Sequence, residues 1–259
     1  MREELLEIAL EAAEAAGRLL TERFEGPASG VTTKSSPTDL VSDADRAAEE
    51  LIVGHLRKHR PNDGILAEEG GRVDVDSGIT WVIDPLDGTV NYLFDIPVWA
   101  VSIAARDATG NVAGVIHDPN RDETFAATCG GGATLNGVAI RVSDKTTLDD
   151  ALIGTGFSYE ADIRRVQAEV LARVLPLVRD IRRAGSAALD LASLSCGRLD
   201  GFYEATMGEW DKAAGVLIAT EAGARITELR NPRGVDNGVV AANPELHPKL
   251  AALVDREET

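Results

Sequence analysis

The first sixty residues place apolar side chains with a helical period. Between residues 5 and 19, Leu and Ala recur at steps of three and four among Glu and Arg, which predicts an amphipathic helix that Gly26-Pro27 ends. Residues 29–39 are small and polar, so we expect a loop or a short hairpin there. Ser42 then has the position of an N-cap for a second helix, which Pro61 stops.

Beyond Gly64 the pattern changes to short apolar runs separated by turn residues. These runs predict strands, some of them buried on both faces, at residues 65–67, 81–83, 98–104 and 112–116. Asn136-Gly137 predicts a tight hairpin turn.

The second half of the chain begins with a return of the helical period. Residues 162–199 predict two helical segments, split near residues 183–185. The remaining elements predicted are a strand near residues 199–203, a helix over 211–222 ended by Gly223, strands near 224–229 and 239–242, and a final helix opened by Pro244. Because helices and strands alternate in blocks, we expect layered α and β structure without a linker or a repeat.

Composition and charge narrow the range of partners. The 259 residues carry a formal net charge of −17 and are 44% hydrophobic, which is typical of a globular protein of one or two domains. Since nucleic acids and anionic membranes attract basic patches, we expect neither as a partner.

Cysteine usage and the N-terminus favour a cytoplasmic protein. Cys129 and Cys196 are far apart and fit no metal or redox spacing, so we expect two reduced thiols. Met1 is followed by charged residues, and no window approaches the length of an apolar membrane span.

The strongest chemical signal is Asp84-Pro85-Leu86-Asp87, which follows an apolar strand. It brings two carboxylates and the Leu86 carbonyl into one small volume, with the proline fixing a turn between them. Two buried carboxylates repel each other, so a divalent cation is the simplest stabiliser. A purely structural Asp-Pro turn followed by an Asp N-cap is the alternative.

Two further acidic segments accompany this one. Glu68-Glu69 follows another apolar run, and Asp211 lies in the first turn of a predicted helix. A solvated loop and a helix-dipole contact are the respective alternatives. All these candidate ligands are hard oxygens, which favours Mg²⁺ or Mn²⁺ over Zn²⁺. The four histidines are expected to be surface or satisfied groups, and the motifs of serine hydrolases, P-loop enzymes and dinucleotide enzymes are absent.

Together these residues resemble the inositol monophosphatase family. Its first signature is similar to residues 81–92 (WVIDPLDGTVNY), and its second is similar to Trp210-Asp211-Lys212-Ala213-Ala214-Gly215 with Glu221-Ala222-Gly223. Further matches, in the family's order, are at residues 34–41, 44–45, 68–69, 181–188 and 202–204. The resemblance implies a layered α/β/α/β/α sandwich. We expect one domain over residues 1–259, with an N-terminal half of about 1–145 and a C-terminal half of about 146–259.

The resemblance also implies roles for single residues. Glu68, Asp84, the Leu86 carbonyl, Asp87 and Asp211 would bind two or three Mg²⁺ ions, and Gly88 and Thr89 would hold the phosphate through backbone N–H groups. Thr89 and Glu68 would orient the attacking water, Asp45 would reach a weaker metal through water, and Lys34 would lie on a mobile loop.

Substrate choice is expected from residues that face the leaving alcohol. The resemblance gives Glu204 as the acceptor of hydrogen bonds from inositol hydroxyls, with Ser186 and Ala187 lining the same pocket. Glu209 adds a negative charge near it and leaves fine specificity open. Fructose-1,6-bisphosphatase activity is the first alternative, and hydrolysis of histidinol phosphate or of 3′-phosphoadenosine phosphate is a weaker one.

A different class is a catalytically idle, metal-binding regulatory protein that keeps the fold. Because every ligand position of the family is filled here, we expect a small-molecule phosphatase instead. The resemblance further implies inhibition by lithium and a homodimer.

Overall fold

The computed structural model describes residues 1–24, 30–33, 40–73 and 77–255. Its helices are α1 (Arg2–Phe24), α2 (Asp43–His59), α3 (Thr89–Leu93), α4 (Ala161–Val174), α5 (Ala187–Ser195), α6 (Glu209–Glu221) and α7 (His247–Val254), with a 3₁₀ turn at Leu175–Leu177. Lys34 and most of the polar stretch at residues 29–39 lie outside the described residues.

The larger sheet has eight strands in the order β10-β9-β8-β7-β6-β5-β3-β4. Neighbours are antiparallel except for the parallel pair β3 and β5. Its strands are β3 (Gly64–Ala67), β4 (Gly71–Val73), β5 (Thr80–Asp87), β6 (Ala100–Asp107), β7 (Gly110–Asp118), β8 (Glu123–Thr128), β9 (Gly132–Leu135) and β10 (Val138–Ala139).

The smaller sheet has five strands in the order β12-β11-β13-β15-β14. Its strands are β11 (Leu152–Thr155), β12 (Asp180–Arg182), β13 (Gly201–Glu204), β14 (Arg225–Arg230) and β15 (Asp236–Ala242). A separate pair joins β1 (Thr32–Thr33) to β2 (Leu40–Val41).

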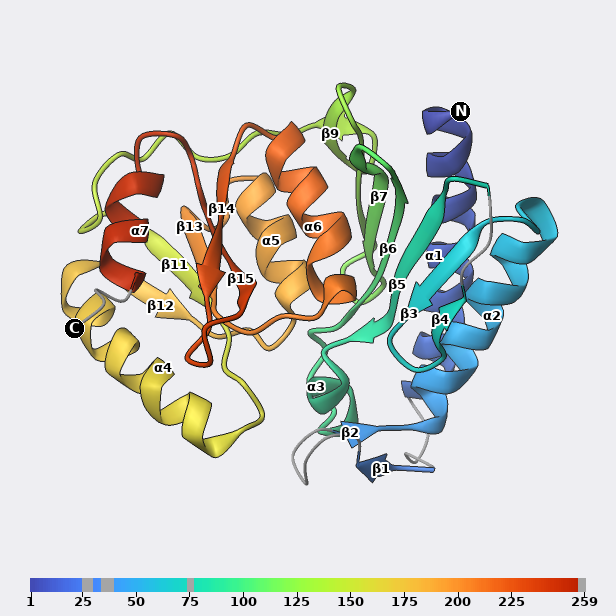
Figure 1. Cartoon of the computed structure of the whole chain (residues 1–259), viewed down its shortest axis with the longest axis horizontal. Helices are drawn as coiled ribbons and strands as arrows, with labels where there is room; N and C mark the ends of the chain where they lie inside the picture. Colours follow the sequence, from blue (N-terminus) through green and yellow to red (C-terminus); the bar gives the residue numbers. More distant parts are fainter. Residues whose placement is uncertain (25–29, 34–39, 74–76, 256–259) are drawn as a thin grey trace.

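The layers follow the predicted α/β/α/β/α order, as Figure 1 shows from right to left. Helices α1 and α2 pack on one face of the eight-stranded sheet, α5 and α6 fill the space between the sheets, and α4 and α7 cover the five-stranded sheet. The apolar run of β5 is continuous because alternate residues of the strand pack into cores on opposite faces of the sheet. Trp81 and Ile83 pack towards α1 and α2, whereas Val82 packs towards α5 and α6.

Several local predictions are confirmed. Ser42 caps α2, where its hydroxyl accepts a hydrogen bond from Ala44 N–H at 3.2 Å. Asn136 and Gly137 form the two-residue turn between β9 and β10, both with positive φ, as such a turn requires. Gly223 follows α6 with φ of 93°.

Three predicted boundaries are wrong. The short strand β12 lies where a helical segment was expected, because residues 180–182 pair with β11. The last helix begins at His247 rather than at Pro244, with a proline in its first turn. The segment Asp84-Pro85-Leu86-Asp87 is the end of β5 rather than a turn, and the extra residues form an irregularity in its pairing with β6.

Among the described residues, no helix combines the length and the apolar character needed to cross a membrane.

Candidate active site

A polar cleft lies between the two sheets and encloses about 1130 Å³ of space that is open to solvent. Ten of the eleven predicted site residues line it: Glu68, Asp84, Leu86, Asp87, Gly88, Thr89, Ser186, Ala187, Glu204 and Asp211. The eleventh, Asp45, is fully buried and contacts Thr89. The structure therefore brings together residues that are up to 143 positions apart in the sequence.

The bulged end of β5 supplies the centre of the cleft. Asp84 is only 2% exposed, and its Oδ1 accepts a hydrogen bond from Leu86 N–H at 3.1 Å. Burial raises the pKa of Asp84, and the negative charges of Glu68, Asp87 and Asp211 raise it further. None of these dominant influences is a basic group, so the ionised form of this carboxylate lacks a compensating charge.

Asp87 is held by the beginning of α5. Its Oδ2 accepts hydrogen bonds from the Ser186 hydroxyl and from Ala188 N–H, the latter at 2.8 Å. Burial raises the pKa of Asp87 to about 6, although these two hydrogen bonds act in the opposite direction. Ser186 thus lines the cleft mainly as the residue that positions Asp87.

Glu68 follows β3, the parallel neighbour of β5. Its N–H donates to Ile83 O at 3.2 Å, which extends the strand pairing up to the acidic residue. The next residue is held by α2, since Glu69 N–H donates to Glu49 Oε2 at 2.8 Å. Glu68 lines the cleft, so strand pairing accounts for its place beside Asp84.

Thr89 connects the cleft to the buried carboxylate of Asp45. Its hydroxyl lies 2.9 Å from Asp45 Oδ1 and 3.1 Å from Leu86 O. Asp45 Oδ2 accepts hydrogen bonds from the N–H and the hydroxyl of Ser42, at 2.9 and 2.5 Å. Asp45 therefore completes the capping box of α2 and orients the Thr89 side chain at the same time.

Gly88 precedes the short helix α3 and has φ of 99°, in the left-handed region. A Cβ at this position would lie 2.9 Å from Val98 O and 3.2 Å from Trp99. Only glycine meets both requirements without strain, and Gly88 and Thr89 both line the cleft.

The opposite wall carries Glu204 at the end of β13. A Cβ at Gly156 would overlap the Glu204 carboxylate, so Gly156 makes room for this side chain. Burial raises the pKa of Glu204 well above its usual value, and the charges of Asp211, Asp190 and Asp87 add to this, while Arg183 opposes it.

Asp211 and Glu209 lie in the first turn of α6 but face different surroundings. Asp211 lines the cleft, and its Oδ2 accepts a hydrogen bond from Gly208 N–H at 2.6 Å. Glu209 Oε2 instead pairs with Arg106 at 2.8 Å, and its Oε1 with Lys212 at 3.3 Å. The negative charge of Glu209, which made the substrate specificity hard to predict from the sequence, is thus compensated by Arg106 and Lys212.

Four residues with a clear place at the site were missed by sequence reasoning. Gly156, Arg183 and Asp190 line the cleft, and Asn91 lies beside it, donating to Val98 O at 2.8 Å and to Ala184 O at 2.9 Å. Asn91 is part of the first signature motif and Arg183 lies in the matching stretch 181–188, so the sequence held a signal for both residues. Gly156 has its place through contacts between distant segments.

The residues present fit a hard divalent cation. Glu68, Asp84, Asp87 and Asp211 offer carboxylate oxygens, and three of them raise the pKa of the fourth. A cation would relieve this repulsion, and an all-oxygen donor set suits Mg²⁺.

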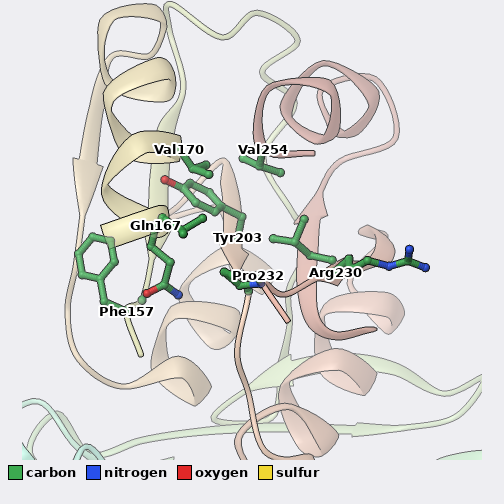
Figure 2. A pocket seen from close by; sticks show the side chains of 11 residues that line it. Phe157, Gln167, Val170, Tyr203, Arg230, Pro232 and Val254 are labelled. Carbon is green, nitrogen blue, oxygen red and sulfur yellow. The ribbon is translucent and has the colours of Figure 1, made fainter. Parts of the chain in front are cut away.

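A second pocket, whose outline includes about 390 Å³ of space partly open to solvent, lies on the other face of β13 and has a different character. Figure 2 shows Tyr203 from β13 and Gln167 from α4 among its mostly apolar walls. It shares Gly156 and Phe157 with the cleft. Because Tyr203 and Glu204 are consecutive strand residues, they face opposite sides, and β13 separates an apolar pocket from the acidic cleft.

Comparisons with known proteins agree with this geometry. The model of the inositol monophosphatase family matches residues 1–259. "Inositol-1-monophosphatase SuhB" of Mycobacterium tuberculosis is 46% identical over an alignment of 237 residues that covers 87% of this chain and 81% of that protein. "Nus factor SuhB" of Escherichia coli is 38% identical over 252 residues, covering 96% of this chain and 94% of that protein.

Among solved structures, the extragenic suppressor protein suhB from Bartonella henselae superimposes with a TM-score of 0.92 at 38% identity. The superposition covers 98% of this chain and 99% of that one. The family match over the whole chain, the identity to these relatives and the shared fold lead to one conclusion: the chain belongs to the inositol monophosphatase family.

Proposed function

We propose that this protein is a Mg²⁺-dependent phosphatase that hydrolyses myo-inositol monophosphate. One observation carries the proposal, and it concerns the two walls of the cleft. On one wall, carboxylates crowd around Asp84 and repel one another. On the other wall, the carboxylate of Glu204 occupies the space that is open because residue 156 is a glycine. The first wall suits a cation and a phosphate, and the second suits a ring of hydroxyl groups.

Glu68, Asp84, the Leu86 carbonyl, Asp87 and Asp211 would hold two or three Mg²⁺ ions, for which Mn²⁺ would substitute. When bound, the ions would supply charge neutralisation and a lowered pKa of water. The contacts of Asp87 with the beginning of α5 support this assignment, because they fix one carboxylate oxygen in place before any ligand arrives.

Thr89 would orient the attacking water together with Glu68. When the Thr89 hydroxyl donates to Asp45, its oxygen lone pairs stay available to accept a hydrogen bond from a water in the cleft. Asp45 would therefore act through Thr89 and not by contact with the substrate.

The backbone N–H groups of Gly88 and Thr89 would bind the phosphate. They lie at the beginning of α3, where N–H groups lack partners within the helix and attract an anion. The close packing of Gly88 against Val98 and Trp99 keeps this segment rigid.

Glu204 would accept hydrogen bonds from the hydroxyl groups of the leaving alcohol, with Ser186 and Ala187 beside it. Among the described residues that line the cleft, Arg183 is the only basic one. This balance favours a substrate with one phosphate, since a second phosphate would need further positive charge. Fructose 1,6-bisphosphate, which carries two phosphates, is the first alternative substrate, followed by histidinol phosphate and 3′-phosphoadenosine phosphate.

A regulatory role is the second candidate function. Its support is that the Escherichia coli relative, which aligns with 96% of this chain, is named "Nus factor SuhB". The two functions make different demands on the cleft, because a purely regulatory protein has no need for the ordered carboxylates around Asp84.

The deciding experiment measures phosphate release from inositol 1-phosphate and fructose 1,6-bisphosphate in parallel, with Mg²⁺ and with EDTA. We expect a higher kcat/KM for inositol 1-phosphate and no turnover in EDTA. A preference for fructose 1,6-bisphosphate would overturn the substrate but keep the phosphatase. If neither substrate is hydrolysed, histidinol phosphate and 3′-phosphoadenosine phosphate are tested next, and absence of turnover with all four would favour the regulatory function.

Two further properties implied by the family stay predictions. Lithium added to the same assay is expected to inhibit phosphate release. Sedimentation equilibrium is expected to give the mass of a homodimer.

A further inference from the structure

A second group of potential metal ligands lies on the outer helical layer. Glu11 of α1 and His55 and His59 of α2 each offer one ligand atom, and these atoms all lie within 4.8 Å of one another. The two imidazole rings are 4.5 Å apart between centroids. The sequence contained one signal of this group, since residues four positions apart lie on the same face of a helix.

The expectation that every histidine is a surface or satisfied group holds for only part of the set. His117 contacts the Thr124 hydroxyl at 2.9 Å, and His247 Nε2 contacts the Thr227 hydroxyl at 3.0 Å. Among the described residues, His55 Nε2 and His247 Nδ1 are buried without a hydrogen-bond partner, and of these two nitrogens only His55 Nε2 belongs to a group of potential metal ligands. A buried polar atom without a partner destabilises the folded state, so a ligand bound at His55 Nε2 would stabilise it.

The carboxylate of Glu11 faces His55 Nε2 but does not satisfy it. Glu11 Oε2 lies 3.4 Å away, close enough for an ion pair but without hydrogen-bond geometry. Burial and the neighbouring His59 lower the pKa of His55, and the charge of Glu11 opposes this shift. A nitrogen lone pair and a carboxylate oxygen that face each other are stabilised by a cation between them.

His59 is already oriented in the way that metal-binding histidines usually are. Its Nδ1 lies 3.1 Å from the backbone carbonyl of His55. With Nδ1–H donating to this oxygen, Nε2 carries the lone pair. Such a hydrogen bond to the second ring nitrogen fixes the ring and raises the basicity of the ligand.

We propose that Glu11, His55 and His59 form a binding site for a late first-row transition metal, with Zn²⁺ as its probe, which joins α1 to α2. Two imidazole nitrogens and one carboxylate oxygen are a donor set that suits Zn²⁺ and discriminates against Mg²⁺. Solvent would complete the coordination, because Glu11 and His59 are exposed.

This site is separate from the cleft. Ten residues of α2 separate His55 from Asp45, which corresponds to roughly 15 Å along the helix axis. None of the three ligands lines the cleft. The site would therefore stabilise the helical layer rather than take part in phosphate hydrolysis.

The test is calorimetric titration of the full-length protein with Zn²⁺ in a buffer that contains millimolar Mg²⁺ to occupy the cleft. We expect His59→Gln and His55→Gln to lose one Zn²⁺ equivalent or to weaken it at least 10-fold. The matched control is Lys58→Gln, an exposed position on the same helical turn, which should bind as the original protein does. Because His59 is exposed, its variant should keep its fold and its phosphatase activity.

A second measurement locates the ion. Anomalous scattering at the zinc edge from Zn²⁺-soaked crystals should give a peak between α1 and α2, and Zn²⁺ should raise the Tm of the original protein more than that of His59→Gln. Equal stoichiometry and affinity in all variants, or an anomalous peak in the cleft alone, would overturn the proposal.

Discussion

The two walls of the cleft carry acidic residues in contrasting surroundings. On the wall formed by β5, Asp84 is influenced most by burial and by three other carboxylates. On the wall formed by β13, Glu204 is also buried and near carboxylates, but Arg183 partly compensates its charge and Gly156 provides its space. The contrast separates two tasks, since crowded acids favour a cation whereas an acid with its own space can accept hydrogen bonds from a neutral ligand.

Removing one acid from the crowded wall should have the largest effect. Asp84→Asn deletes a proposed ligand without changing the size of the side chain, so we expect Mg²⁺-dependent kcat/KM to fall by more than about 100-fold. This exceeds the loss that substitutions behind metal ligands usually cause. Phosphate release at saturating Mg²⁺ measures it, and circular dichroism checks the fold. Turnover within 10-fold of the original protein would contradict the assigned metal site.

The opposite wall should respond through substrate preference. Glu204→Gln removes a charged acceptor, and hydrogen bonds to charged groups contribute about 1.5–3 kcal/mol, so kcat/KM for inositol 1-phosphate should fall roughly 10–100-fold. Hydrolysis of p-nitrophenyl phosphate, which lacks ring hydroxyls, should change far less.

Gly156→Ala provides a matched test, because its methyl group would displace the Glu204 carboxylate. We expect the same selective loss for inositol 1-phosphate. If both variants lost the two activities equally, the division of tasks between the walls would be wrong.

The pH dependence of the free energy of unfolding of the metal-free protein should reveal the repulsion among the carboxylates of the cleft. Burial raises the pKa of Asp87 to about 6, above its usual value of 3.8, so the folded state binds this proton more tightly than the unfolded state. The resulting stability is fully present below the usual pKa and is lost as the pH rises through about 6. In EDTA, Asp87→Asn should therefore gain stability relative to the original protein across this range, by up to about 3 kcal/mol.

Thermal unfolding of both proteins between pH 4 and 7.5 measures this difference. Added Mg²⁺ should reduce it by stabilising the original protein at the higher pH. A difference that stays constant with pH would show that the charge of Asp87 is compensated without a metal.

The smallest effect is expected just outside the cleft. Glu209→Ala breaks an ion pair with Arg106 whose two side chains are 32% and 45% exposed, and pairs of this kind contribute about 0–1 kcal/mol. We expect a small loss in the free energy of unfolding, measured in urea, and unchanged kcat/KM. A large change in substrate preference would mean that this charge acts on the pocket after all.

Local patterns in the sequence predicted much of this molecule. The cap at Ser42, the turn at Asn136-Gly137 and the doubly buried strand around Val82 all depend on neighbouring residues. The acids of the cleft could also be predicted, because each lies in a signature string with its own local geometry. Among the segments that supply these acids, the local geometry was predicted wrongly for Asp84-Pro85-Leu86-Asp87, because a strand can accommodate extra residues in a bulge.

Features that depend on contacts between distant segments could not be predicted. Nothing near Gly156 in the sequence indicates that it makes room for Glu204. The strand β12 is short and mostly exposed, so its pairing with β11 decides its structure and its own composition does not. Glu11 lies 44 residues from His55, and only the packing of α1 on α2 brings them together.

The hydrogen bonds between Asp87 and the beginning of α5 have a consequence for folding during translation. Asp87 contacts Ser186 and Ala188, and Asn91 contacts Ala184, across 93 to 101 residues of chain. At translation rates of about 5–20 residues per second, roughly 5–20 s pass between the synthesis of Asp87 and that of its partners. During this interval the nascent chain exposes a cluster of uncompensated carboxylates, and the first half cannot complete the cleft before the second half emerges from the ribosome.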